Sequence, residues 1–482
     1  MSGAVFEETV FVLPGICMYF HVHQPRRLKH YGLLDAPDSQ GDLENDYFDD
    51  GLNKHYLKNA AENCYLPTNA ILAKLLREYS GEFKASYSVS GVLLDQCEEA
   101  APDVIQSFLE LRDTGCVEFL GETFYHSLSS LFFDSDEFKR QVRMHSQKIR
   151  KTFGCKPKAF RNTELLYNDG IARIVEKMGF RTVLSEGIER VLEWRSPNYV
   201  YRPAGCKNLS LLLRNYKLSD DIGFRFSARD WNEWPLMADK YAAWLSACNG
   251  QTINLFMDYE TFGEHHWRES GIFDFLAHFP GEALKHGNLS FRTVSETGAL
   301  PVAGEISVPT NLSWADLERD ASAWLGNRMQ WSCFHELQKI GSLLEDLREA
   351  EAAAKRAGKH AGKRVGTRAS RGGVGDDFLR EVWGLLQTSD HLLYCCTKSW
   401  ADGDVHKHFS PYKLNTPIEN YTNYMNILID FKNFLEKRVL DARRDSARAS
   451  RLGKASAAVA AEAAAPAVGT VDAVEAFGVG SV

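Results

Sequence analysis

Two carboxylates in this chain stand where a pair of acids could carry out chemistry. Asp258 directly follows the segment 253–257, and Glu164 closely follows the segment 159–161. Short apolar runs are typical of buried strands, and acids at the carboxyl ends of strands lie where α/β folds place their active sites. Two such acids on separate strands fit a glycosidase, which needs a nucleophile and a proton donor. Either acid alone would also fit an ordinary helix cap or loop.

Two histidines follow the first apolar run, residues 16–20. Alternation along a strand puts His21 and His23 on one face, and Pro25 then turns the chain away. The pair could form part of a metal site, or it could hold sugar hydroxyls or a carboxylate. We favour the sugar interpretation because the other predicted strands end without a histidine, which a metal site would require.

A further acid, Glu118, lies inside the apolar segment 117–120. An inward-facing carboxylate is costly unless it is paired, for example with His23 or Arg161. A salt-bridged core acid and a direct contact with substrate are both consistent with this position. His126 lies on the loop that follows, from which it could reach a bound sugar.

The elements that must position these residues alternate between strand and helix. Amphipathic stretches, with Pro102 as a start signal and Gly154 as a stop signal, separate seven predicted strands. Such alternation predicts a parallel sheet, most economically closed as an irregular seven-stranded β/α barrel over residues 15–310, after an extension 1–14. The predicted strands are 16–20, 83–89, 117–120, 159–161, 182–185, 209–213 and 253–257.

A helical domain, residues 311–440, is predicted to follow the barrel, with helices at 315–347, 377–388 and 418–440. The basic segment 351–375 is poor in apolar residues and is predicted to be disordered, as a solvated linker or in weak contact with something acidic. The Ala-rich tail 441–482 is also predicted to be disordered. The run Ser389-Asp390-His391 lies in this domain and, taken alone, is compatible with a structural helix.

Composition limits the function classes that this chain can belong to. The 482 residues exceed what one core usually supports, and the net charge of -8 argues against a nucleic-acid or anionic-membrane partner. The 10 cysteines lack zinc-ligand spacing, which suggests reduced thiols. No secretory signal and no bilayer-spanning run of about 20 apolar residues is recognisable. We expect a cytoplasmic protein, and the sequence does not predict its oligomeric state.

Five segments in this order resemble the signature regions of glycoside hydrolase family 57, and the resemblance covers about residues 16–434. It implies retaining action on α-glucans by a seven-stranded β/α barrel followed by a helical region. Segments 313–316, 323–327 and 386–391 are similar to the α-amylase group rather than to the branching enzymes or glucanotransferases. Those enzymes favour an aromatic residue at the position of Arg161. The five segments are 23–25, 115–118, 162–164, 258–263 and 389–391.

The resemblance also implies roles for individual residues. Glu164 matches the nucleophile and Asp258 the general acid/base, which we expect to be held protonated. Positions that line the glucose subsite at the cleavage point are matched by His23, Glu118, Glu260 and Asp390. We also expect His126 and His391 to contact substrate. Asp390 is expected to reach the barrel mouth from the helical domain. No metal and no organic cofactor is implied.

The predicted activity is retaining hydrolysis of α-1,4-glucosidic bonds in glucans of the starch and glycogen type. The nearest alternative is a 4-α-glucanotransferase, in which a sugar hydroxyl replaces water on the same catalytic pair. A metal-dependent barrel hydrolase using His21 and His23 is an alternative of another class. A glucan-binding protein without catalytic activity is a third.

Overall fold

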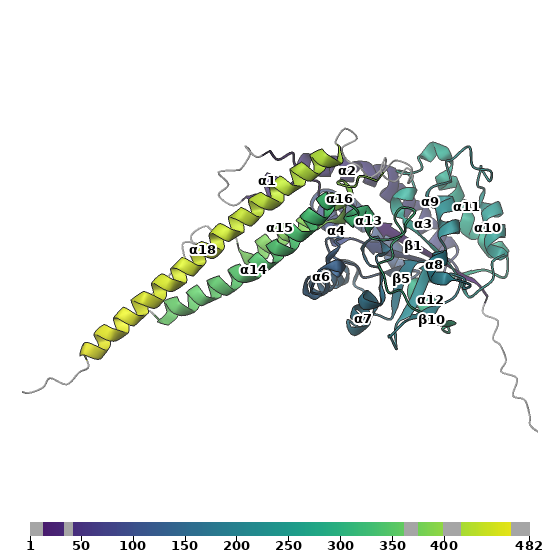
Figure 1. Ribbon diagram of the computed structural model, residues 1–482. Helices are drawn as coiled ribbons and strands as arrows, with labels where there is room; N and C mark the ends of the chain where they lie inside the picture. The colour runs from purple at the N-terminus through teal and green to yellow at the C-terminus, as the bar shows by residue number, and fades with distance from the viewer. Residues whose placement is uncertain (1–12, 33–41, 361–374, 399–415, 464–482) are drawn as a thin grey trace, which may run out of the picture. The chain divides into compact units, whose positions relative to one another are not determined.

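The computed structural model describes residues 13–32, 42–360, 375–398 and 416–463 (Figure 1). The chain divides into two compact units. One contains residues 1–338 and 381–429, and the other contains residues 339–380 and 430–482. The division differs from the predicted boundary at residue 310, because two segments assigned to the helical domain belong to the unit that contains the barrel.

All seven predicted strands are present in that unit, and every strand pair among them within the two sheets is parallel. One sheet has the order β3-β2-β1-β8, and the other contains β4, β5 and β7 as neighbours. A bridge between Gly121 and Phe160 and a bond from the Asn215 amide to the Asn254 carbonyl (2.9 Å) connect the sheets into an irregular barrel. The strands are β1 (Gly15–Val22), β2 (Ala85–Val89), β3 (Val117–Phe119), β4 (Ala159–Phe160), β5 (Thr182–Glu186), β7 (Ser210–Arg214) and β8 (Thr252–Asp258).

Three short strands were not predicted from the sequence: β6 (Tyr201–Pro203), β9 (Ser290–Phe291) and β10 (Gly304–Ile306). Strands of two or three residues are too short to show a period of alternation. β6 pairs antiparallel with β7 and parallel with β10, and β9 pairs with β1. β6 and β10 therefore extend the edge of the second sheet, whereas β9 pairs with the first residues of β1 inside the first sheet.

The alternation of side chains along β1 determines which of its residues point into the barrel. Its even-numbered residues from Ile16 to Val22 pack in the cluster formed with the surrounding helices, whereas Cys17 and Tyr19 pack in the cluster inside the barrel. Successive strand residues point to opposite faces, so His21 continues the inward row at the carboxyl end of the strand. By the same alternation, Asp258 lies above the inward-facing Phe256 on β8.

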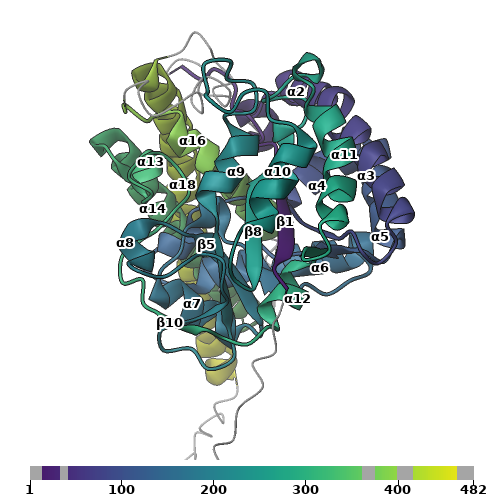
Figure 2. The ribbon, with the colours of Figure 1, turned by 90° about the vertical axis from the view of Figure 1, so that its right-hand side faces the viewer.

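Helices surround this barrel, and Figure 2 shows β1, β5 and β8 in the interior with α3, α10 and α11 around them. As predicted, α5 begins at Pro102 and α6 ends before Gly154, whose φ of 71° is left-handed. The helices are α1 (Leu43–Tyr47), α2 (Asp50–Ala60), α3 (Leu66–Glu78), α4 (Gly91–Ala100), α5 (Pro102–Asp113), α6 (Asp136–Phe153), α7 (Asp169–Lys177), α8 (Glu189–Leu192), α9 (Tyr216–Gly223), α10 (Ala238–Ser246), α11 (Ile272–Lys285) and α12 (Val294–Gly298). A π-helical turn at Ala61–Tyr65 joins α2 to α3.

The later elements are helical, as predicted, but their bounds differ from the prediction. They are α13 (Ser322–Leu325), α14 (Arg328–His360), α15 (Asp376–Leu386), α16 (Ser389–Leu393) and α18 (Pro417–Ala463). Residues 315–321, expected to open a helix, are not helical. Within the described parts of the chain, no helix is long and apolar enough to cross a membrane.

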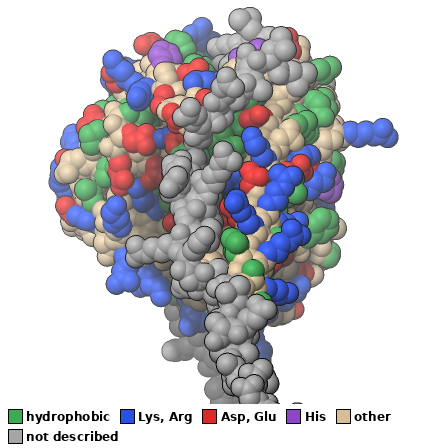
Figure 3. Space-filling model, turned by 90° about the vertical axis from the view of Figure 1, so that its left-hand side faces the viewer, with side chains coloured by type: hydrophobic (Ala, Val, Ile, Leu, Met, Phe, Trp, Pro, Cys, Tyr) green, Lys and Arg blue, Asp and Glu red, His purple; other side chains and the backbone are tan. Residues whose placement is uncertain are grey.

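Residues 361–374 and 464–482 of the two segments predicted to be disordered lie outside the described parts. The prediction was wrong for residues 351–360 and 441–463, because they continue the helices α14 and α18. Figure 1 shows these two helices side by side. Ion pairs join them, from Arg438 to Glu351 at 2.7 Å and from Arg443 to Asp346 at 3.0 Å. Alanine and long charged side chains favour helix, so a charged, alanine-rich composition here forms helix instead of disorder. Figure 3 shows both acidic and basic side chains exposed on the face of the protein that it draws.

Gly263 closes the loop after β8 in a conformation that other residues adopt with strain. Its φ is 110°, and a Cβ atom there would lie 2.0 Å from the Asn63 carbonyl oxygen. We therefore expect Gly263→Ala to destabilise the protein by about 2 kcal/mol or more, measured as a lower midpoint of unfolding. Gly287→Ala is the matched control, because a Cβ atom at Gly287 meets open space. Equal midpoints for the two variants would contradict the expected clash at Gly263.

Candidate active site

Asp258 and the two histidines of the first strand meet at the carboxyl end of the barrel. β1 and β8 pair with His21 opposite Asp258, and His21 Nδ1 lies 3.2 Å from the Asp258 carboxylate. His23 contacts Ser90 Oγ through Nδ1 at 2.7 Å and Asp390 Oδ2 through Nε2 at 3.2 Å. The predicted inward orientation of both histidines is therefore found.

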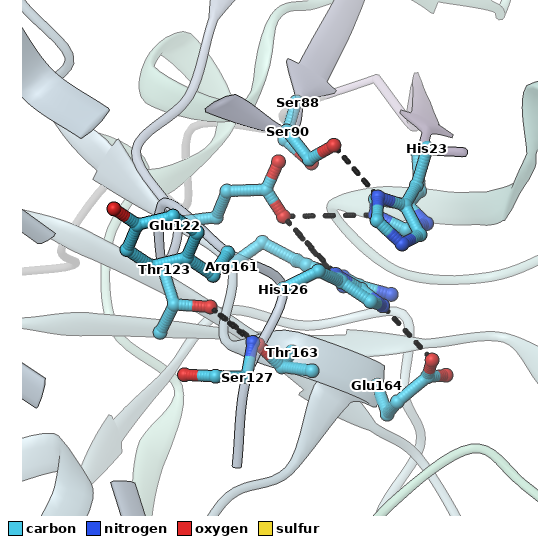
Figure 4. Close-up of polar contacts among 12 residues, drawn as sticks. His23, Ser88, Ser90, Glu122, Thr123, His126, Ser127, Arg161, Thr163 and Glu164 are labelled. Atoms are coloured by element: carbon cyan, nitrogen blue, oxygen red, sulfur yellow. Dashed lines mark hydrogen bonds and ion pairs between the residues drawn. The ribbon is translucent and has the colours of Figure 1, made fainter. Parts of the chain in front are cut away.

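Glu164 follows β4 in a left-handed conformation, with a φ of 56° that is uncommon for residues other than glycine. Both of its carboxylate oxygens have nitrogen partners: Oε1 lies 2.9 Å from His126 Nε2, and Oε2 accepts a 2.8 Å bond from Trp314 Nε1 (Figure 4 shows the His126 contact). The Glu164 carbonyl also accepts a bond from the Ser313 hydroxyl. These contacts fix the position of the carboxylate. His126 lies in the site, but its side chain is only 1% exposed, so the expected contact of His126 with a sugar is corrected.

A buried acid that was not predicted, Glu122, lies between the two histidine–carboxylate pairs. Its Oε2 atom is 3.6 Å from His21 Nε2, 3.6 Å from His126 Nδ1 and 3.9 Å from Arg161 Nη1, and Oε1 is 3.8 Å from His145 Nε2 (Figure 4 shows Glu122 beside His126). The side chain of Glu122 is 0% exposed, whereas those of Glu164 and Asp258 are 18% and 22% exposed. A substrate can therefore touch the outer two acids but not the central one.

Glu118 occupies a different place from the one expected, and the expectation of substrate contact is corrected. It pairs with Ser86, which pairs with Tyr19, so it lies well below the end of the strands. Leu120 stands between it and Glu122 in the inward row of the same strand and loop. The Glu118 carboxylate accepts bonds from the amide and hydroxyl of Ser295, in the first turn of α12. The rule that strand-end acids mark the site would have selected Glu122.

Asp390 reaches the barrel mouth from α16, as its 3.2 Å contact with His23 shows. The chain is fixed there because the amide of Ser389 donates to the carbonyl of His126 at 2.9 Å. His391 does not share this position, because its ring is buried against Tyr424 with the ring centroids 5.3 Å apart. The expected contact of His391 with substrate is therefore corrected.

Glu260 also lies at the site, on the single turn after β8. Its Oε1 atom accepts a 2.5 Å bond from the Tyr65 hydroxyl and a longer bond from the His23 amide. Burial and the charge of Asp258 raise the pKa of Glu260 to about 8. Glu260 is therefore mostly protonated at neutral pH.

Two other residues at the site were not assigned a role from the sequence. Arg161 is fully buried, and its guanidinium lies over the ring of Trp314 at 4.9 Å. The three guanidinium nitrogens have no hydrogen-bond partner among the described residues. Arg161 thus supplies a positive charge behind the carboxylates.

The adjacent imidazoles of His23 and His126 differ in charge. Burial lowers the pKa of His126, but the carboxylates of Glu122 and Glu164 outweigh it and raise the pKa to about 9. Burial lowers the pKa of His23 to about 4, and the neighbouring charge of His126 acts in the same direction. Their ring centroids are only 4.1 Å apart, so a neutral His23 avoids repulsion between two cations.

Glu164 and Asp258 are both ionised at neutral pH in the unliganded protein. Burial tends to raise each pKa, but the contact with His126 lowers that of Glu164, and the contact with His21 lowers that of Asp258. The expectation that Asp258 is held protonated is therefore wrong for the free site. The charge of Asp258 tends to raise the pKa of Glu164, but His126 and Arg161 lower it more strongly.

A barrel with two solvent-accessible carboxylates at its carboxyl end is the arrangement of an enzyme that acts on glycosidic bonds. The profile of glycosyl hydrolase family 57 matches residues 17–309. A curated protein of Methanocaldococcus jannaschii named "Putative alpha-amylase" is 43% identical over 435 residues, which cover 89% of this chain and 86% of that protein. This chain belongs to glycosyl hydrolase family 57.

Solved structures agree on the fold. A branching enzyme of this family from Pyrococcus horikoshii has a TM-score of 0.58 at 16% identity, over 92% of this chain and 94% of the other. The 4-α-glucanotransferase of Thermococcus litoralis has a TM-score of 0.51 at 16% identity, over 79% of this chain. This chain spans only 56% of that glucanotransferase. At such identities the similarity establishes the architecture and not the substrate.

The raised pKa of Glu260 predicts a dependence of stability on pH. Because the folded protein binds this proton more tightly than the unfolded chain, the stabilisation is complete below pH 4.5 and is lost as the pH rises to about 8. Each pH unit in that window costs at most about 1.4 kcal/mol. Glu260→Gln should remove this contribution, so its free energy of unfolding should fall less than that of the wild type between pH 5 and pH 8.

Glu269→Gln is the control for this experiment, because Glu269 is exposed. The measurement is denaturant-induced unfolding of the three proteins across the stated pH range. Parallel stability curves for the wild type and Glu260→Gln would contradict the assignment of a proton to Glu260.

Proposed function

We propose that this protein is a retaining α-glucan hydrolase of the α-amylase type, which cleaves α-1,4-glucosidic bonds in glucans of the starch and glycogen type. One observation carries the proposal. Glu164 and Asp258 are partly exposed carboxylates at the ends of β4 and β8, and each is held by an imidazole, His126 and His21 respectively. Membership of the family and the named relative support the same class of reaction.

In the first step, Glu164 attacks the anomeric carbon, and the bond from that carbon to the leaving sugar's oxygen breaks. Asp258 donates a proton to that oxygen. Because Asp258 is ionised in the free site, it must take up the proton as substrate binds. A bound sugar excludes water, and in that poorly solvated space the nearby charge of Glu164 raises the pKa of Asp258.

In the second step, the glycosyl-enzyme is hydrolysed. Formation of the ester consumes the negative charge of Glu164, so the pKa of Asp258 falls and its carboxylate is formed as the leaving sugar departs. Asp258 then removes a proton from a water molecule that attacks the anomeric carbon. Two inversions give a product with the configuration of the substrate.

Substrate is held in this proposal by His23, Glu260 and Asp390, whereas His126, whose side chain is 1% exposed, positions Glu164. Neutral His23 and protonated Glu260 offer both donors and acceptors to sugar hydroxyls, whereas Asp390 offers acceptors. Asp390 arrives from α16 and thus opposes the strand ends, which restricts the sugar from a second side. That restriction is a reason for a helical segment to accompany the barrel.

The test is incubation of the protein with soluble starch and with maltotriose, followed by analysis of product length. A hydrolase shortens starch and yields from maltotriose only products shorter than maltotriose. Products longer than maltotriose would assign the protein as a 4-α-glucanotransferase, the alternative with the same catalytic pair. Unchanged substrates would contradict both activities.

Glu164→Gln should lower kcat by roughly 10⁴-fold or more, because it removes the nucleophile of a covalent step, while glucan binding is retained. Glu118→Gln is a matched control, since it makes the same chemical change on an acid that binds Ser295 outside the site. It should keep most of the activity. The proposal fails if Glu164→Gln keeps more than about a tenth of wild-type kcat, and the placement of Glu118 fails if both variants lose activity alike.

A further inference from the structure

Four buried polar atoms beneath the two catalytic carboxylates point at one another without forming hydrogen bonds. They are His21 Nε2, both oxygens of Glu122 and His126 Nδ1, and none has a hydrogen-bond partner among the described residues. The contacts between them, at 3.6 Å, are too long for hydrogen bonds. Buried polar atoms are costly when unsatisfied, so the cluster indicates that a further group satisfies them.

The spacing of these atoms fits a metal ion. One ligand atom from each of His21, Glu122 and His126 lies within 4.8 Å of the others, and all three residues are buried. Glu122 Oε2 lies 3.6 Å from each of the two imidazole nitrogens, and those nitrogens lie within 4.8 Å of one another. A point between the three atoms is therefore roughly 2.0–2.4 Å from each, close to the roughly 2.0–2.2 Å at which zinc binds imidazole nitrogen and carboxylate oxygen. Nitrogen and oxygen donors in this number suit a divalent transition metal.

The second nitrogen of each imidazole already has the partner that metal-binding histidines require. His21 Nδ1 faces Asp258 at 3.2 Å, and His126 Nε2 faces Glu164 at 2.9 Å. A metal-bound histidine usually donates its remaining N–H to a carboxylate, which fixes the tautomer and the ring orientation. Here that arrangement leaves the lone pairs of His21 Nε2 and His126 Nδ1 directed at Glu122.

The local charge is also suited to a dication. With neutral imidazoles, Glu122, Glu164 and Asp258 carry three negative charges, and Arg161, 3.9 Å from Glu122, carries one positive charge. A divalent ion would neutralise the remainder. The competing state has protons on the imidazoles in place of the metal, and the experiment below distinguishes the two.

We propose that His21, Glu122 and His126 bind a divalent transition metal ion of the zinc class in the floor of the active site. The ion would not replace Glu164 or Asp258 in the reaction. It would hold His21 and His126 in the tautomers that donate to those two carboxylates. This inference does not rest on the proposed function, because metal binding can be measured without substrate.

The test begins with the full-length protein, freed of metal by a chelator and titrated with zinc chloride and with cobalt chloride. We expect one equivalent to bind, with weak visible bands for the cobalt form and without the intense near-ultraviolet band of a thiolate ligand. Glu122→Gln and His126→Gln should weaken binding by roughly 100-fold or more. His266→Gln, which changes a buried histidine bonded to Ser227 and Gly223, is the control and should bind like the wild type.

X-ray absorption by the zinc-loaded wild type keeps the test decisive if a variant fails to fold. We expect imidazole nitrogen and carboxylate oxygen around the zinc and no sulfur. The proposal is overturned if the wild type binds no stoichiometric metal, if sulfur ligands are found, or if folded Glu122→Gln and His126→Gln bind metal as tightly as the wild type does.

Discussion

The contacts of the Glu122 carboxylate with His21 and His126 are the interactions on which the rest of the site depends. Glu122 lies fully buried beside His21 and His126, and those imidazoles in turn contact Asp258 and Glu164. A buried carboxylate without partners would be strongly unfavourable, so the two histidines and Glu122 constrain one another's positions. The carboxylates of Glu164 and Asp258 are thereby fixed from the buried side of the site.

This arrangement requires several distant segments to meet at one end of a barrel. β1 and the turn after it supply His21 and His23, the segment after β3 supplies Glu122 and His126, and Glu164 and Asp258, the acids proposed to be catalytic, come from the ends of β4 and β8. Inward-facing layers such as Tyr19 and Phe256 fill the barrel below them. Parallel strands place their carboxyl ends together, and α16 then adds Asp390. The site is thus a consequence of the topology.

The positions of the strands were predictable because each is a short apolar run, and the positions of Glu164, Asp258 and His23 followed from the strand ends. The position of Glu118 was predicted wrongly, because the alternation of side chains along a strand indicates which face a residue lies on but not how deep in the barrel it lies. Asp390 was located through family resemblance, since no local pattern on a helix indicates a distant sheet. Trp314 and Arg161 act through contacts between segments that are far apart in sequence. Residues 351–360 and 441–463 were misjudged because low apolar content also suits a long charged helix.

The most direct test of the proposed mechanism is covalent trapping of the intermediate. The wild-type protein is incubated with a 5-fluoro-maltosyl fluoride, whose electronegative substituent slows breakdown of the glycosyl-enzyme, and the digested protein is mapped by mass spectrometry. We expect the peptide containing Glu164 to gain the mass of the fluorinated maltosyl group and activity to be lost in parallel. A label on any other residue of a protein that hydrolyses starch would contradict the role of Glu164 as the nucleophile.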